Sequence, residues 1–142
     1  MDFSLPATSD NATTRPLKDR RLRVLVVEDF ESMRRNVVST LETLNMEILE
    51  AVNGLDALRI LDNEKVDMVF TDLVMPEMDG FELSEEIRRR TDLRHLPVIV
   101  ISTHRDAKYV IQALRRGADD YITKPFAAPL AGRVVERALS HV

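Results

Sequence analysis

The sequence predicts an α/β fold, in which a five-stranded, parallel, doubly wound sheet carries helices on both faces. Five short apolar runs alternate with segments of helical spacing, which is typical of strand–helix units that form a parallel sheet. The first run, Leu22–Val27, is nearly continuously apolar, as in a strand covered on both faces. Because crossovers between parallel strands are right-handed, the helices are distributed over both sides of the sheet.

The first half of the predicted domain holds three strands and two helices. Leu22–Val27 is a buried strand, Met46–Glu50 alternates weakly and is expected at a sheet edge, and Val66–Thr71 is a third strand. A turn-rich segment follows Asp72. The inward-facing helical residues are predicted to be Met33, Val37, Leu41 and Leu44 in the first helix, and Leu55, Leu58 and Leu61 in the second, after Gly54.

The second half holds three helices and two strands. Pro97–Ile101 is the most apolar strand, and its proline can only begin it. Gly117 is expected to end the helix that precedes the short last strand, Tyr121–Thr123. The helices are predicted over Phe81–Arg90 (Leu83 and Ile87 inward), over Asp106–Arg116, and from Pro129 onward, with Leu130, Val134 and Ala138 as an apolar stripe. With strand order 2-1-3-4-5, the result is a flavodoxin-like three-layer sandwich.

The composition indicates one domain with a short appendage. The chain has 142 residues, of which 44% are hydrophobic and 31% charged, with a formal net charge of −4. This acidic balance argues against a nucleic-acid binder or a binder of anionic membranes. The sequence has no cysteine and no run of ~18 apolar residues that could span a membrane. A cytoplasmic protein is expected, with residues 1–20 as a disordered arm and residues 21–142 as the domain.

Polar side chains follow four of the five predicted strands. Glu28 and Asp29 come after the first strand, Asp72 after the third, and Ser102 and Lys124 lie at the ends of the fourth and fifth. In a parallel α/β sheet, ligands bind beyond the carboxyl ends of the strands, where the strand order reverses. Strands one and three are neighbours at that point, so the three carboxylates are expected to converge.

This combination of residue types indicates phosphoryl chemistry. Clustered carboxylates repel one another unless a cation binds, and oxygen ligands without His or Cys favour Mg²⁺ or Mn²⁺ over zinc. A lysine and a hydroxyl at the same edge would contact the oxygens of a phosphoryl group. Asp72 is then a candidate nucleophile that forms an acyl phosphate.

Each of these residues also has an ordinary structural explanation. Asp29 could cap the first helix, Asp72 could be a turn residue, Ser102 a strand-end hydroxyl and Lys124 a surface charge. Their joint occurrence at four strand ends of one edge favours a site over the separate explanations.

The motifs at these positions resemble those of the response-regulator receiver family. The similarity covers about Arg21 to Val142 and rests on the segments Val26–Asp29, Asp72–Gly80, Pro97–Ser102 and Gly117–Phe126. The resemblance implies that Asp72 is the phosphoacceptor of a two-component system. Its donor would be a phosphohistidine on a sensor histidine kinase or on a histidine phosphotransfer protein. The domain would be a signalling phosphoacceptor, limited to its own phosphorylation and dephosphorylation, rather than an enzyme.

The resemblance also implies a metal site and a set of phosphoryl contacts. Asp29, Asp72 and the main-chain carbonyl of Val74 would ligate Mg²⁺ or Mn²⁺, with Glu28 contributing directly or through water. Ser102 and Lys124 would each bind a phosphoryl oxygen. The peptide between Lys124 and Pro125 is expected to be cis.

A conformational switch is implied as well. Tyr121 is similar to the switch aromatic of the family, which swings inward as Ser102 moves toward the phosphoryl group. The face made by the fourth helix, the fifth strand and the fifth helix would then bind a downstream protein or a second copy. No effector domain follows Val142 in the sequence, so output through a partner is expected, unless the chain is part of a longer protein.

The sequence departs from the common family pattern at a few positions. Glu28 replaces the commoner Asp and Ser102 the commoner Thr, and both changes keep the oxygen. Val74 and His104, two places after Asp72 and Ser102, occupy positions that tune the lifetime of the phosphoryl group. Val74 cannot hold a water by a hydrogen bond, whereas a neutral His104 could, so a slow autodephosphorylation is expected.

Three other classes of function compete with this interpretation. A Mg²⁺-dependent phosphatase of the haloacid-dehalogenase type would need a second Asp where Val74 stands. A flavodoxin-like cofactor binder would have its phosphate repelled by Glu28 and Asp29. A receiver-like module that binds a partner without being phosphorylated remains open.

Overall fold

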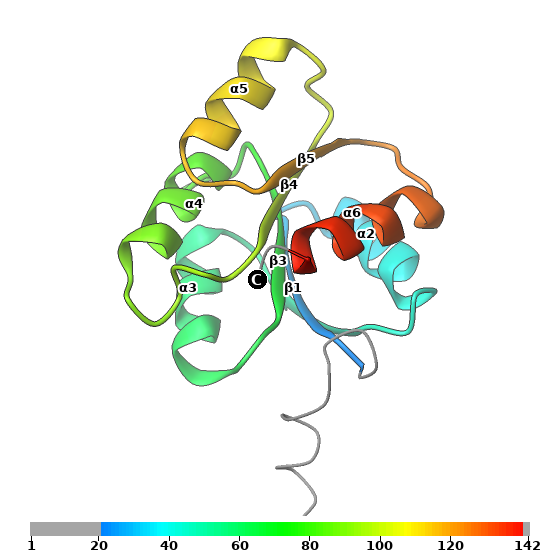
Figure 1. Ribbon diagram of the computed structural model, residues 1–142, viewed down its shortest axis with the longest axis horizontal. Helices are drawn as coiled ribbons and strands as arrows, with labels where there is room; N and C mark the ends of the chain where they lie inside the picture. The colour runs from blue at the N-terminus through cyan, green and yellow to red at the C-terminus, as the bar shows by residue number, and fades with distance from the viewer. Residues whose placement is uncertain (1–20, 141–142) are drawn as a thin grey trace, which may run out of the picture.

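The computed structural model describes residues 21–140, which form five strands and five helices in three layers (Figure 1). The strands are β1 (Arg23–Val27), β2 (Glu47–Ala51), β3 (Met68–Asp72), β4 (Val98–Ser102) and β5 (Asp120–Thr123). The helices are α2 (Glu31–Glu42), α3 (Gly54–Asn63), α4 (Gly80–Arg89), α5 (Ala107–Arg115) and α6 (Ala128–Leu139). The predicted arm, residues 1–20, lies outside the described residues.

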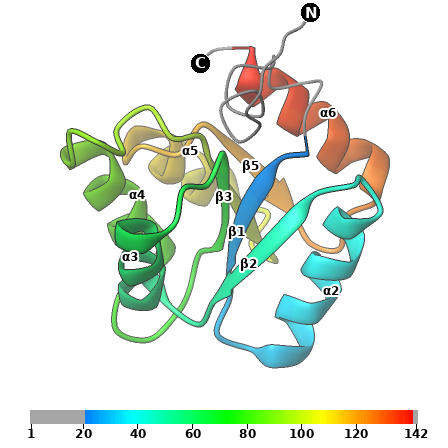
Figure 2. The ribbon, with the colours of Figure 1, turned by 90° about the horizontal axis from the view of Figure 1, so that it is seen from below.

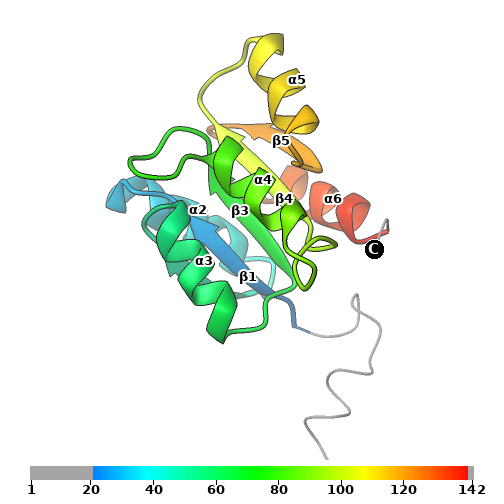
Figure 3. The ribbon, with the colours of Figure 1, turned by 90° about the vertical axis from the view of Figure 1, so that its left-hand side faces the viewer.

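The five strands form one parallel sheet in the order β2-β1-β3-β4-β5, which confirms the predicted fold class and strand order. Helices α2 and α6 cover one face of the sheet, and α3, α4 and α5 cover the other (Figures 2 and 3). The register pairs Val27 with Thr71 and Asp72 with Ile101. The carboxyl ends of β1, β3 and β4 therefore emerge side by side at one edge.

The core fills both interfaces between the sheet and its helices. Alternate residues of β1 point to opposite faces, as the period of a strand requires: Val24 and Val26 pack with α2 and α6, whereas Leu25 and Val27 pack with α3 and α4. A smaller cluster beside α5 contains Leu73, Val100, Ala113 and Ala118.

Two predicted core positions, one in α3 and one in α6, are wrong, whereas Leu58, Leu61, Val134 and Ala138 are buried as predicted. Leu55 of α3 is 50% exposed and Leu130 of α6 is 39% exposed. In α3 the buried residues start at Gly54, and Leu55 is rotated about 100° from it. In α6 the stripe is centred one position later than predicted, on Ala131, Val134, Val135 and Ala138.

Candidate functional site

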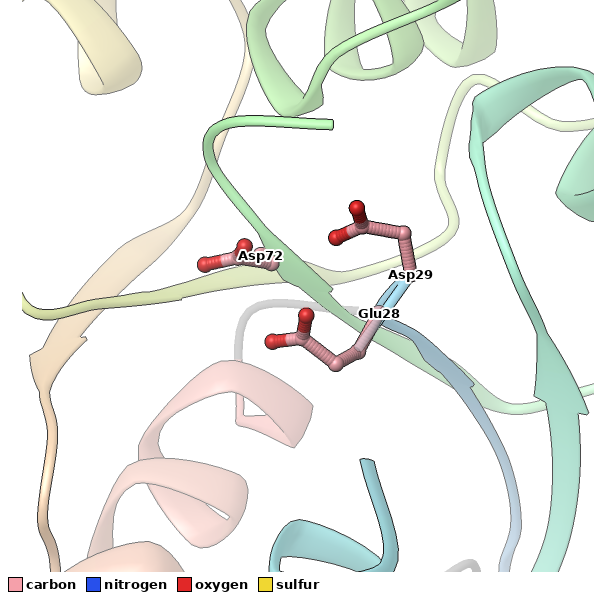
Figure 4. Close-up of side chains that lie close together, drawn as sticks. All are labelled: Glu28, Asp29 and Asp72. Atoms are coloured by element: carbon pink, nitrogen blue, oxygen red, sulfur yellow. The ribbon is translucent and has the colours of Figure 1, made fainter. Parts of the chain in front are cut away.

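Three carboxylates lie together beyond the ends of β1 and β3 (Figure 4). Glu28 and Asp29 directly follow β1, Asp72 is the last residue of β3, and ligand oxygens of the three lie within 4.8 Å of one another. Glu28 is buried, Asp72 is half-buried and Asp29 is exposed. Within residues 21–140, no other group of three His, Cys, Asp or Glu side chains has this spacing.

Lys124 brings a positive charge to this cluster. Its Nζ lies 2.7 Å from Oε1 of Glu28 and 3.3 Å from Oδ1 of Asp72. Burial raises the pKa of Glu28 and the pKa of Asp72 above the ordinary values, and Lys124 opposes both shifts. The charge of Asp72 raises the pKa of Glu28 further, and that of Asp29 does the same for Asp72. A divalent cation would relieve this repulsion.

The connection from β1 to α2 fixes the main chain of the acidic pair. The N–H of Phe30 donates to Oε2 of Glu28 at 3.0 Å, and Nη1 of Arg34 donates to the main-chain carbonyl of Glu28 at 2.9 Å. Nε of Arg34 also lies 2.8 Å from Oε1 of Glu50 on β2. The N-cap of α2 is Phe30, without a side-chain hydrogen bond, so Asp29 does not cap this helix.

The loop after Asp72 is fastened at its far end by Gly80. The N–H of Gly80 donates to the carbonyl of Leu73 at 2.9 Å, and a Cβ on Gly80 would lie 2.3 Å from the carbonyl oxygen of Asp72. Only glycine allows this approach of α4 to the end of β3. Asp79 and Glu82 form a capping box at the start of α4. The loop is thereby held against the strand that carries Asp72.

Ser102 and Lys124 lie at the same edge of the sheet as Asp72. Ser102 is buried at the end of β4, directly after Ile101, which pairs with Asp72. The N–H of Lys124 donates to the carbonyl of Ser102 at 2.8 Å. The peptide between Lys124 and Pro125 is cis, as expected. The hydroxyl, the ammonium and the carboxylates are thus brought to one edge by four different strands.

Tyr121 connects this edge to the loop before α5. Its ring packs in the cluster that contains Leu73 and Val100, and its hydroxyl donates to the carbonyl of His104 at 2.8 Å. The N–H of His104 donates to Oγ of Ser102 at 3.0 Å. Burial raises the pKa of Tyr121, so the hydroxyl stays a donor at neutral pH. Ser102 and Tyr121 are therefore linked through one residue of this loop.

The two predicted lifetime positions have different surroundings. The Val74 side chain is 63% exposed in the loop after β3. The His104 ring stacks on Tyr109 of α5, with 4.3 Å between ring centroids and 28° between the planes. The metal-ligand role of the Val74 carbonyl stays a prediction. The three carboxylates themselves fit Mg²⁺ or Mn²⁺, because they offer hard oxygen atoms and carry like charges in a partly buried space.

A cleft of about 320 Å³ adjoins Lys124 on the side of α2. It is lined by Ser32, Met33, Asn36 and Val37 of α2 and by Thr103, Lys124, Pro125 and Phe126. The cleft therefore lies between the first helix and the connection from β5 to α6, next to the acidic cluster.

Sequence reasoning missed the role of Arg34. One acceptor, the carbonyl of Glu28, directly follows β1, whereas the other, the carboxylate of Glu50, belongs to β2, sixteen positions from Arg34. No local pattern connects them. A basic residue one turn into the first helix and an acidic residue on the edge strand are a weak signal, which only the parallel pairing of β1 with β2 makes meaningful.

Residues 24–133 match the response regulator receiver domain family, and the chain belongs to this family. It is 39% identical to chemotaxis protein CheY-3 of Vibrio cholerae over 111 residues, which are 78% of this chain and 85% of that protein. It is 37% identical to a chemotaxis protein CheY homolog of Campylobacter jejuni over 120 residues, 83% of this chain and 92% of the relative.

Solved receiver structures have the same fold. The signal receiver domain of a signal transduction histidine kinase from Syntrophus aciditrophicus has a TM-score of 0.77 at 35% identity, covering 85% of this chain and 92% of that domain. The receiver domain of a sensor histidine kinase from Pseudomonas aeruginosa, with a magnesium ion coordinated in its active-site cleft, has a TM-score of 0.77 at 24% identity, covering 84% of this chain and 98% of that domain.

Throughout residues 21–140, each helix is too short or too polar to cross a membrane.

Proposed function

We propose that Asp72 accepts a phosphoryl group from a phosphohistidine of a sensor histidine kinase or a histidine phosphotransfer protein. The observation that carries the proposal is the meeting of three carboxylates with Lys124 at the carboxyl edge of the sheet, where Nζ is 3.3 Å from Asp72. A carboxylate oxygen of Asp72 would attack phosphorus, the phosphorus–nitrogen bond would break, and the imidazole would leave and take up a proton.

The remaining residues of the edge have complementary tasks. The Lys124 ammonium would neutralise charge on one phosphoryl oxygen, and the Ser102 hydroxyl would donate to another. Mg²⁺ or Mn²⁺ held by Asp29, Asp72, the Val74 carbonyl and Glu28 would offset the negative charge of the acceptor and of the phosphoryl group. Glu28 contributes through water or by rearrangement, because both of its carboxylate oxygens already have hydrogen-bond partners.

Phosphorylation would switch the face formed by α5, β5 and α6. Ser102 would donate to the new oxygen, which disturbs the bond that its Oγ accepts from His104, and Tyr121 donates to the carbonyl of the same residue. Ile111 and Leu114 of α5 are exposed. A downstream protein or a second copy would bind the form that the phosphoryl group favours.

The lifetime of the phosphoryl group would depend on Val74 and His104. Val74 offers no hydrogen bond to an attacking water, so Val74→Asn is expected to shorten the lifetime. If the His104 imidazole orients that water, His104→Ala is expected to lengthen the lifetime. The measurement is the decay of phospho-Asp72 in the parent, Val74→Asn and His104→Ala.

The direct test is incubation with acetyl phosphate, with and without Mg²⁺, followed by intact-mass measurement. A gain of about 80 Da, one phosphoryl group, that requires Mg²⁺ or Mn²⁺ and is labile in alkali is expected. Persistence of the gain in Asp72→Asn would refute the assignment. A parent that gains no mass, although it binds a partner, would support the alternative of a receiver-like binding module that is not phosphorylated.

A further inference from the structure

We propose that Glu28 is a positioning residue that holds Lys124 in the unphosphorylated protein, and that a divalent cation must loosen this ion pair when it enters the site. The inference rests on the proposed function and deepens it. It assigns Glu28 a task other than direct metal ligation. Lys124 and the cation then compete for the Glu28 carboxylate.

The contacts of Glu28 carry the proposal. Nζ of Lys124 is 2.7 Å from Oε1 of Glu28 but 3.3 Å from Oδ1 of Asp72, so Glu28 is the nearer counterion. The two paired side chains are 9% and 1% exposed. Oε2 of Glu28 accepts the N–H of Phe30 at 3.0 Å, so both carboxylate oxygens have partners.

The path of this ion pair through the fold is also informative. Glu28 follows β1 and Lys124 follows β5, and in the sheet β3 and β4 lie between these strands. The pair therefore bridges the carboxyl edge past the end of β3, where Asp72 stands. Arg34 donates to the main-chain carbonyl of Glu28. Glutamate is one methylene longer than aspartate, and this extra length serves the reach to Lys124.

Competition for one carboxylate has a defined consequence for metal affinity. While Lys124 neutralises Glu28, an entering cation gains less from that charge and is repelled by the ammonium. Removal of the ammonium should tighten Mg²⁺ binding, and most of this gain should disappear when Glu28 carries no charge. General repulsion between Lys124 and the metal would instead give the same gain with or without Glu28.

The experiment is a double-mutant cycle on Mg²⁺ affinity, measured by calorimetry or by amide NMR titration without any phosphodonor. The variants are the parent, Lys124→Met, Glu28→Gln and the double variant. We expect Lys124→Met to tighten Mg²⁺ binding about tenfold in the parent and less than about threefold in the Glu28→Gln background. The matched control is Lys108→Met, an exposed lysine over the Tyr109 ring, which should leave the affinity unchanged.

A second readout follows the ammonium itself. The NH₃⁺ signal of Lys124 should be observable by ¹⁵N NMR in the metal-free parent, because a buried ion pair slows its exchange with water. It should be lost in Glu28→Gln and in Glu28→Asp, which keeps the charge but shortens the reach. Glu28→Asp also serves as the second variant if Glu28→Gln does not fold.

The outcomes separate the two proposals. Equal gains from Lys124→Met in both backgrounds, with Mg²⁺ bound normally, would overturn the competition while the proposed function stands. Retention of the Lys124 signal in both Glu28 variants would do the same. Failure of the parent and every variant to bind Mg²⁺ would overturn the proposed metal site, and the competition with it.

Discussion

The amino and carboxyl ends of the sheet differ in how their charges are balanced. At the amino ends of β4 and β5, the Arg88 guanidinium donates to the carbonyls of Gly117 at 2.9 Å and Leu96 at 2.6 Å and pairs with Asp119. At the carboxyl end, three carboxylates lie within 4.8 Å of one another, near one ammonium. One end is neutralised by its own side chains, whereas the other has an excess of negative charge.

The amino end of the sheet contributes to stability, and the carboxyl end carries the candidate site. Arg88 joins the end of α4, the loop before β4 and the turn before β5, and Asp119 also accepts the N–H of Val98 at 2.8 Å. Such a set of satisfied hydrogen bonds rigidifies the frame. The acidic cluster costs stability, because its carboxylates are partly buried beside like charges. The amino end of the sheet therefore contributes a rigid frame, whereas the carboxyl end keeps a negative charge that favours the binding of a cation.

The largest effect is expected from Gly80→Ala at the functional end. The new Cβ would lie 2.3 Å from the carbonyl oxygen of Asp72, which belongs to the main chain and cannot move aside cheaply. We expect a loss of about 3 kcal/mol or more in the free energy of unfolding, together with impaired phosphorylation of Asp72. Urea denaturation measures the first effect and the mass assay the second. Wild-type stability in this variant would contradict the close approach.

Arg88→Met should lower the stability of the amino end of the sheet without changing the candidate site at the carboxyl end. The substitution leaves the carbonyls of Gly117 and Leu96 and the Asp119 carboxylate without this donor, for an expected loss of about 2 kcal/mol in the free energy of unfolding. Affinity for Mg²⁺ should change little. Arg89→Met is the matched control: Arg89 is exposed and pairs with Glu86 within α4, and its loss should cost less than about 0.5 kcal/mol.

The fold and the site differ in how far the sequence predicts them. Periodicity predicted the strands and helices, because side chains repeat every two residues in a strand and every 3.6 in a helix. The flavodoxin-like arrangement then supplied the strand order, and the polar residues after four of the strands supplied the carboxyl edge. In α3, Leu58 and Leu61 are buried as predicted but Leu55 is not, because the buried face is completed by Gly54 and Ala57 instead. Small residues give a weak signal even where they face the core.

Side-chain partners across the sheet could not be predicted. Lys124 and Glu28 are 96 positions apart, and only the folded edge shows that the lysine is closer to Glu28 than to Asp72. Arg88 likewise resembles its neighbours Arg89 and Arg90 in the sequence, yet its acceptors belong to segments 6 to 8 and 29 to 31 positions further on. Residue type predicted the chemistry of the edge, but not which charges are paired.

Asp72→Asn should stabilise the functional end in the absence of Mg²⁺. Burial raises the pKa of Asp72, so the native state binds this proton more tightly than the unfolded chain, and ionisation lowers stability as pH rises. The variant should gain on the order of 1 kcal/mol at pH 7. The gain should shrink toward zero as pH falls to the unfolded value of about 3.9. Urea denaturation from pH 4.5 to 7.5 tests this sign, and a variant less stable than the parent at pH 7 would contradict it.

Gly132→Ala should have the smallest effect on stability. It makes the same substitution as Gly80→Ala, but at a glycine whose new Cβ would not approach main-chain atoms closely. Gly132 lies inside α6, and a Cβ there would meet only Leu44 at 3.9 Å, an ordinary contact distance. Alanine restricts the unfolded chain and favours the helix, so a gain of about 0.5–1 kcal/mol is expected. Thermal or urea unfolding measures it, while Mg²⁺ affinity should stay unchanged. Opposite signs for the two substitutions would show that the approach of α4 to Asp72, rather than glycine itself, requires Gly80. A loss of stability in Gly132→Ala would mean that α6 packs more tightly on Leu44 than these distances allow.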